Sequence, residues 1–191
     1  MDRIILASQS PRRQQLMEWA RIDFEIMVSE ADETFPESLP VGQVPIYIAR
    51  NKADAVANKL DAEPIIVAAD TIVVLQGKVL GKPKDRMDAI SILSQLSGKE
   101  HQVITGVVIR QGKKEVSFAD TTRVWFHELT LEQIEFYVDH YSPYDKAGAY
   151  AIQEWIGVVG IRSIEGDFYN VMGLPASRVI GVLGAWGSES E

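Results

Sequence analysis

The chain has 191 residues, with 19 basic and 27 acidic side chains and a formal net charge of −8. Its length suggests one domain, or one domain with an appended lobe, and 46% apolar residues are enough to form a hydrophobic core. Because there is no cysteine, disulfides, thiolate metal sites and cysteine nucleophiles are excluded. The negative charge argues against nucleic acid as a partner. No stretch resembles a signal peptide or a membrane helix, so we expect a cytoplasmic protein that does not bind membranes.

The N-terminal third predicts strands alternating with helices. Apolar residues at 4–7 predict a buried strand, and Ser10 followed by proline predicts the start of a helix over 11–19. A second strand is expected over 24–28. Apolar residues then recur at helical spacing from 45 to 60, which predicts an amphipathic helix.

The rest of the chain continues this mixture of elements. Asp85 and Thr130 are predicted helix N-caps, and Thr130 has a glutamine three residues later, as in a capping box. The expected elements are a strand over 64–69 that resumes over 72–75, a helix over 86–96, a hairpin of strands 102–110 and 115–126, a helix over 130–139, strands over 149–152 and 158–164, and a helix over 176–183. The sequence therefore predicts an α/β fold with a mixed, twisted sheet flanked by helices, as one domain over 1–186 with a frayed tail at 187–191.

The tripeptide Ala-Asp-Thr occurs twice, at Asp70 and at Asp120. Asp70 follows a continuous apolar run, so it is expected at the carboxyl end of a central strand, where α/β sheets place ligands. Asp120 lies in a segment of alternating polarity, as in a half-exposed hairpin strand. We favour Asp70 as the functional aspartate, while a turn or cap role for it stays open.

Basic residues gather at the junctions between the predicted elements. Ser8, Arg12 and Arg13 lie at the first strand-to-helix turn, where free N–H groups and the helix dipole favour an anion. Lys52 lies within a predicted helix, and Lys82 lies in a Gly-Lys-Pro turn. These five residues are candidate phosphate ligands. A capped helix start with solvated arginines, and ordinary surface lysines, are the alternatives.

Carboxylates are the candidate metal ligands. If a polyphosphate binds near the basic residues, Glu33 and Asp70 can supply the oxygen donors that Mg²⁺ or Mn²⁺ prefers. The histidines lack the spacing of a metal-binding motif. His101 and His127 each neighbour a glutamate, and we expect both at solvent-facing strand ends.

Seven short motifs occur in the order found in Maf proteins. They are Leu6–Arg13 (LASQSPRR), Ala49–Ala53 (ARNKA), Ala69–Val73 (ADTIV), Gly81–Pro83 (GKP), Thr105–Val107 (TGV), Asp145–Tyr150 (DKAGAY) and Gly173–Pro175 (GLP). The chain therefore resembles the Maf family from residue 4 to about residue 183. The resemblance implies a fold like that of inosine triphosphate pyrophosphatases, with two lobes around a cleft, and it is compatible with a homodimer.

The resemblance also implies an activity. Maf proteins are nucleoside triphosphate pyrophosphatases that use a divalent metal, and Asp70 matches their general base. The segment 145–153 resembles the branch that acts on dTTP and UTP, in which Arg12, Thr71 and Gln153 match the specificity positions. Modified pyrimidine triphosphates stay open as further substrates. The alternative functions are a nucleotide-binding regulator of septum formation and cell division, and a house-cleaning hydrolase of modified purine triphosphates.

Two features of the segment around Gln153 bear on which base the chain would recognise. A glutamine amide at Gln153 can accept from N3–H of uracil or thymine while donating to O4, whereas cytosine reverses this edge. The chain departs from the branch pattern at Ala151 and Glu154, where glycine is usual.

Overall fold

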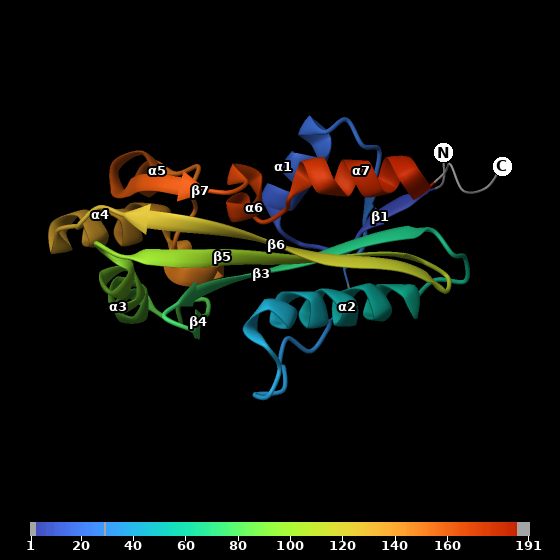
Figure 1. Ribbon diagram of the computed structural model, residues 1–191, viewed down its shortest axis with the longest axis horizontal. Coiled ribbons are helices and arrows are strands. Elements are labelled where there is room, and N and C mark those ends of the chain that lie inside the picture. Colours follow the sequence, from blue (N-terminus) through green and yellow to red (C-terminus); the bar gives the residue numbers. More distant parts are fainter. Residues whose placement is uncertain (1–2, 29, 187–191) are drawn as a thin grey trace. The chain divides into compact units, whose positions relative to one another are not determined.

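The computed structural model of the chain describes residues 3–28 and 30–186 (Figure 1). The helices are α1 (Pro11–Trp19), α2 (Val44–Ala57), α3 (Arg86–Leu96), α4 (Leu131–Tyr141), α5 (Trp155–Gly160), α6 (Phe168–Met172) and α7 (Ala176–Trp186), with short 3-10 helices η1 (Val41–Gln43), η2 (Pro143–Asp145) and η3 (Ala147–Ala149). The strands are β1 (Ile4–Leu6), β2 (Glu25–Ile26), β3 (Ile65–Leu75), β4 (Lys78–Leu80), β5 (Glu100–Gln111), β6 (Lys114–Phe126) and β7 (Ile161–Glu165). No helix in these ranges is long and apolar enough to cross a membrane.

The strands of the described residues form one sheet in the order β2-β1-β3-β5-β6-β7, with β4 beside β3. β1 pairs in parallel with β2 and β3, whereas β4 and β7 pair antiparallel with β3 and β6. The sheet is therefore mixed, as the sequence predicts. The predicted hairpin of β5 and β6 is confirmed, and its turn contains Gly112 with a φ of 56°. Such a positive φ favours glycine.

The chain divides into two compact units. Among the described residues, unit 1 contains those up to Asp70, the segment Thr105–Asp120, and those from Gly173 to Trp186. Unit 2 contains Thr71–Ile104 and Thr121–Met172. The three long strands β3, β5 and β6 each contribute residues to both units. The predicted frayed tail, 187–191, lies outside the described residues.

Helix α2 packs on the sheet of unit 1 through the apolar face that its sequence predicts. Its buried residues join a core cluster with side chains from β1, β3 and β5, and the members of this cluster are Ile5, Ala7, Ile46, Ala49, Ala53, Val56, Ile66, Ala68 and Val108. Figure 1 shows α2 on one side of the sheet and α1 and α7 on the other. Burial of this apolar face holds α2, and with it Lys52, against the sheet.

In unit 2, helix α3 packs against α4 and η3. Both predicted N-caps are present: the Asp85 side chain accepts from the backbone N–H of Asp88 at 2.9 Å, and Thr130 with Gln133 forms a capping box. The sequence therefore determines where both helices start.

The predicted strand over 149–152 is wrong. The predicted strand over 158–164 is wrong for residues 158–160, which belong to a helix, and correct from residue 161. Residues 149–152 are buried without being a strand, and α5 occupies Trp155–Gly160 before β7 begins at Ile161. Gly157 explains part of the difference, because a Cβ at this position would lie 1.7 Å from the Ile152 carbonyl oxygen. This close backbone approach folds the segment into a turn and a short helix, against the β propensity of its valines.

Candidate active site

Asp70 lies in the middle of β3, so the expectation that it emerges at the end of a strand is wrong. The parallel partner β1 pairs with β3 only as far as Val67, so β3 continues beyond the last residue of β1. Asp70 and Thr71 are the two half-buried residues of a strand that is otherwise buried. The parallel pair thus ends three residues before Asp70, and its side chain remains partly accessible.

Lys52 on α2 forms ion pairs with two carboxylates. Its Nζ lies 2.7 Å from Asp70 Oδ1 and 2.9 Å from Glu33 Oε1. The side chains of Asp70 and Lys52 are 14% and 18% exposed, whereas that of Glu33 is 49% exposed. The structure therefore brings three of the candidate residues into direct contact, in a place that is partly shielded from water.

The loop before α2 is tied down next to Glu33. The Asp32 carboxylate accepts from the backbone N–H and the hydroxyl of Thr34, both at 2.8 Å, and these bonds lower the pKa of Asp32. The Asn51 side chain donates to the Asp32 carbonyl at 3.3 Å. Since Asn51 precedes Lys52, the loop is anchored to the same turn of α2 that carries the lysine.

Arg13 is buried at the first turn of α1. Its Nε donates to the Gly173 carbonyl at 2.7 Å, and its Nη1 donates to Ser8 Oγ at 3.2 Å. Burial lowers the pKa of the Arg13 guanidinium, while Asp70 and Glu33 act in the opposite direction. A solvated arginine is therefore excluded at position 13, and the Ser8 and Arg13 side chains lie together in unit 1.

Thr71, Lys82 and Gln153 belong to unit 2. Lys82 is exposed in the turn between β4 and α3, and the preceding Gly81 carbonyl accepts from Gly148 N–H at 3.1 Å. Gln153 is exposed and borders an open depression of about 540 Å³. The other residues lining this depression are Ile152, Gly157, Val158, Ile161, Ser163, Ile164 and Phe168, and none is charged. This lining is better suited to contact an apolar group than to bind a phosphate.

The Glu33 and Asp70 carboxylates can bind a cation that takes its other ligands from water and substrate. Within residues 3–28 and 30–186, no group of three or more histidine or acidic side chains could hold a metal ion alone. Glu33 and Asp70 nevertheless converge on one cationic group, the Lys52 ammonium. Mg²⁺ binds in proteins through one or two carboxylates together with waters and substrate phosphates. Glu33 and Asp70 match this donor set.

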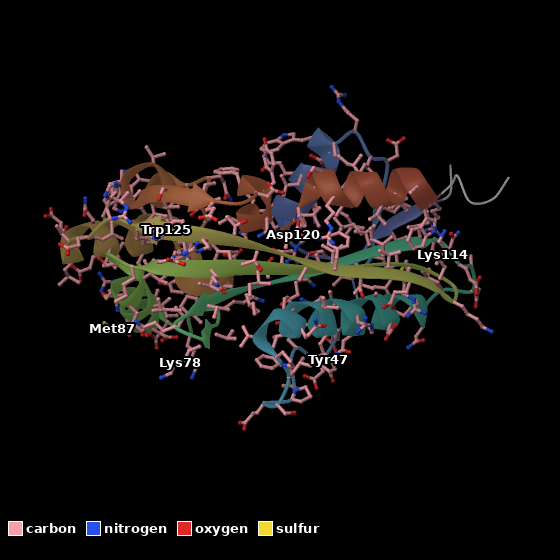
Figure 2. The ribbon with its side chains drawn as sticks, in the orientation of Figure 1. Tyr47, Lys78, Met87, Lys114, Asp120 and Trp125 are labelled. Carbon is pink, nitrogen blue, oxygen red and sulfur yellow. The ribbon has the colours of Figure 1, made fainter. Side chains whose placement is uncertain are left out.

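Asp120, the second aspartate of the repeated tripeptide (labelled in Figure 2), has a different environment from Asp70. It lies on β6 in an ion pair with Arg178 of α7, whose guanidinium also stacks over Phe118 at 4.1 Å. The predicted alternation along this strand is confirmed: Thr122 and Val124 are buried. Asp120 is thus part of the contact between β6 and α7 within unit 1.

His101 corrects the expectation for the histidines. His127 is exposed directly after β6, as predicted, but His101 is only 2% exposed. Its Nε2 lies 2.7 Å from the hydroxyl of buried Tyr150, and its ring packs edge-on against Phe126 and Tyr150. Burial lowers the pKa of His101 to about 4. His101 lies two residues before the buried Val103 on β5, and residues two apart on a strand face the same side of the sheet. This spacing could have predicted that His101 is buried.

Sequence reasoning did not single out Tyr137 and Lys146, the side chains that contact Glu154 next to Gln153. Tyr137 of α4 is buried and contacts Glu154, and Lys146 is buried between two acidic residues. The tyrosine belongs to the apolar face of a predicted helix, and the lysine belongs to the motif at 145–150. No pattern in the sequence alone shows that these residues meet.

Comparison with solved structures defines the class of fold. A HAM1 protein from Coxiella burnetii superposes with a TM-score of 0.55 over 97% of this chain and 100% of that protein, at 14% sequence identity. The chain therefore has the α/β fold of the HAM1 proteins.

Comparison of sequences defines the family. The family model described as Maf-like protein matches residues 3–186, so this chain belongs to the Maf family. Three relatives named dTTP/UTP pyrophosphatase span nearly all of it. Those from Bacteroides thetaiotaomicron and Cytophaga hutchinsonii are 48% and 50% identical over 94% of this chain, covering 94% and 82% of their own lengths. The one from Porphyromonas gingivalis is 42% identical over 98% of this chain and 96% of its own length.

Proposed function

We propose that this chain is a nucleoside triphosphate pyrophosphatase that hydrolyses dTTP and UTP to the nucleoside monophosphate and pyrophosphate. The observation that carries the proposal is the contact of Lys52 with both Glu33 and Asp70. It combines two oxygen donors for a metal with a cation for a phosphate at one partly buried place. The names of the relatives, which cover nearly the whole chain, support the same activity.

The cationic residues are assigned to the triphosphate. In unit 1, the first turn of α1 lies at the positive end of a helix dipole, beside Ser8, Arg12 and Arg13. The Arg13 Nε already donates to Gly173, so this arginine also fixes the turn that it belongs to. Lys52, and Lys82 from unit 2, are assigned to phosphate oxygens.

Glu33 and Asp70 are assigned to a divalent cation, Mg²⁺ or Mn²⁺. When bound, such an ion would neutralise charge on the phosphates and make water a better nucleophile. Lys52 holds the two carboxylates together, which offsets the repulsion between them. The protein thereby keeps both donors in place before a metal arrives.

Asp70 is assigned as the general base. Its carboxylate would accept a proton from the water that attacks the α-phosphorus, and the bond from this phosphorus to the oxygen bridging to the β-phosphate would break. Pyrophosphate then leaves with that oxygen, and the nucleoside monophosphate keeps the oxygen of the water. The cationic side chains would stabilise the charge that develops on the leaving group.

Arg12, Thr71 and Gln153 are assigned to substrate specificity. The exposed Gln153 amide can accept from N3–H and donate to O4 of uracil or thymine. Cytosine would leave both hydrogen bonds mismatched, which costs about 1 to 3 kcal/mol. This cost corresponds to roughly ten- to hundredfold discrimination.

A nucleotide panel tests the proposed function. Each common nucleoside triphosphate is incubated with Mg²⁺, with Mn²⁺ or with EDTA, and pyrophosphate and phosphate are measured separately. We expect pyrophosphate from dTTP and UTP, much less from CTP, and none with EDTA. Slow, unselective turnover would instead favour the regulatory protein of cell division, and a preference for modified purine nucleotides would favour the house-cleaning hydrolase.

A further inference from the structure

The segment that leads to Gln153 is buried. Residues 149–152 are at most 6% exposed, and Gln153 is the exposed residue that follows them. The segment has no strand partner, so a sheet does not hold it in place. Other contacts must therefore fix where the Gln153 side chain begins.

The hydroxyl of Tyr137 binds the chain on both sides of Gln153. Tyr137 is completely buried on α4, and its hydroxyl accepts from the backbone N–H of Ala151 at 3.1 Å. The same hydroxyl donates to Glu154 Oε2. One rigid side chain on a helix thus links a position two residues before Gln153 to the residue directly after it.

Glu154 also faces a buried cation. Lys146 is 7% exposed, and its Nζ lies 2.8 Å from Asp145 Oδ1 and 3.7 Å from Glu154 Oε1. A buried ammonium is costly unless carboxylates or other acceptors surround it. The Glu154 carboxylate therefore has one oxygen facing Lys146 and the other hydrogen-bonded to Tyr137.

The neighbouring backbone has little freedom to move. At Gly148, whose φ is 70°, a Cβ would lie 2.8 Å from a Val73 methyl carbon. On the other side of Gln153, the Trp155 ring packs against Phe136 of α4 with the ring centroids 4.8 Å apart. The chain is thus closely packed five residues before Gln153 and two residues after it.

We propose that Glu154, together with Tyr137, is a positioning residue that holds the Gln153 backbone in one place and so contributes to the selectivity for uracil and thymine over cytosine. This inference rests on the proposed role of Gln153 in base recognition. A glutamine amide carries a donor and an acceptor that exchange places when the amide rotates by 180°. Which edge the amide reads depends on where it lies beside the base, and the contacts at Ala151 and Glu154 fix the backbone position from which it reaches the base. A loosely held Gln153 would therefore discriminate less between the two pyrimidine edges.

Steady-state kinetics with UTP and CTP test this proposal in Glu154→Ala, Glu154→Gln and Tyr137→Phe. We expect Glu154→Ala to reduce the ratio of kcat/KM for UTP over CTP by about tenfold, mainly through KM, with kcat for UTP within about threefold of wild type. Glu154→Gln keeps an acceptor for Tyr137 and should lose less. Tyr137→Phe removes the hydroxyl bridge without changing Glu154 and should also lower the ratio. Glu135→Gln, at an exposed ion pair of α4 with Arg86, is the matched control and should leave the ratio unchanged.

A double mutant separates positioning from general loosening of the fold. If Glu154 acts through Gln153, then Gln153→Ala with Glu154→Ala should discriminate no worse than Gln153→Ala alone. An unchanged ratio in Glu154→Ala and Tyr137→Phe, with only a lower melting temperature, would overturn the positioning role while the pyrophosphatase activity stands. Absence of UTP hydrolysis in the wild type would instead overturn the proposed function, and this inference with it.

Discussion

At the scale of single residues, the contact of Lys52 with Glu33 and Asp70 distinguishes Asp70 from the other aspartate in the same tripeptide. Asp70 contacts a lysine that also binds Glu33, whereas Asp120 pairs with Arg178. The chain thus contains its own control for the general-base assignment, because both aspartates are partly buried members of strands.

We expect Asp70→Asn to lower kcat for pyrophosphate release from UTP by at least about hundredfold, since an amide cannot accept the proton from water. Asp120→Asn should stay within about threefold of wild type. Both variants are compared after circular dichroism has verified their folding. Activity near wild type in folded Asp70→Asn would contradict the assignment.

His101 predicts how stability depends on pH. Burial lowers its pKa from 6.5 to about 4, so below pH 6.5 the unfolded chain binds a proton that the folded chain does not. Stability is therefore lost as the pH falls from about 6.5 to about 4, and this histidine contributes a loss of about 2 kcal/mol between pH 7 and pH 5. In urea unfolding, the free energy of unfolding of His101→Gln should decrease between pH 7 and pH 5 by about 2 kcal/mol less than that of the wild type. Exposed His127→Gln serves as the control, and an equal decrease in all three proteins would rule out the buried histidine as the cause.

At the scale of elements, the motif Thr105–Val107 has a packing role in unit 1. A Cβ at Gly106 of β5 would lie 2.3 Å from the backbone nitrogen of Ile46 in α2. Only glycine lets the strand and the helix approach this closely. Because α2 carries Lys52, this contact also supports the site.

Gly106→Ala should consequently destabilise the protein by about 2 to 4 kcal/mol, since backbone has to move. Gly42→Ala is the matched control, because a Cβ there meets nothing within 4 Å. Thermal unfolding compares the two variants. Equal melting temperatures would contradict the close packing of α2 on β5.

The elements also show where sequence reasoning succeeds and where it stops. Local signals specify the helix caps at Asp85 and Thr130, and periodicity specifies the buried face of α2. The segment 149–164 resembles strands because it is rich in β-branched and small residues, but its conformation depends on tertiary contacts that the local pattern does not contain. The pairing of Lys52 with Asp70 likewise depends on how α2 lies on β3, although each residue is a candidate from sequence alone.

At the scale of the whole molecule, a net charge of −8 coexists with cationic candidates for a triphosphate on α1 and α2. The charge argues against a long nucleic acid but not against one small polyphosphate beside a metal. The family match spans residues 3–186, almost the entire described chain. Resemblance over this full length predicts the fold and the activity, whereas the support around Gln153 requires the structure.

Hydrolysis of UTP in ¹⁸O-labelled water tests the central claim most directly. Attack on the α-phosphorus predicts one ¹⁸O atom in UMP and none in pyrophosphate, measured by mass spectrometry of the products after incubation with Mg²⁺. Label in pyrophosphate, or release of phosphate and UDP in place of pyrophosphate and UMP, would contradict the account.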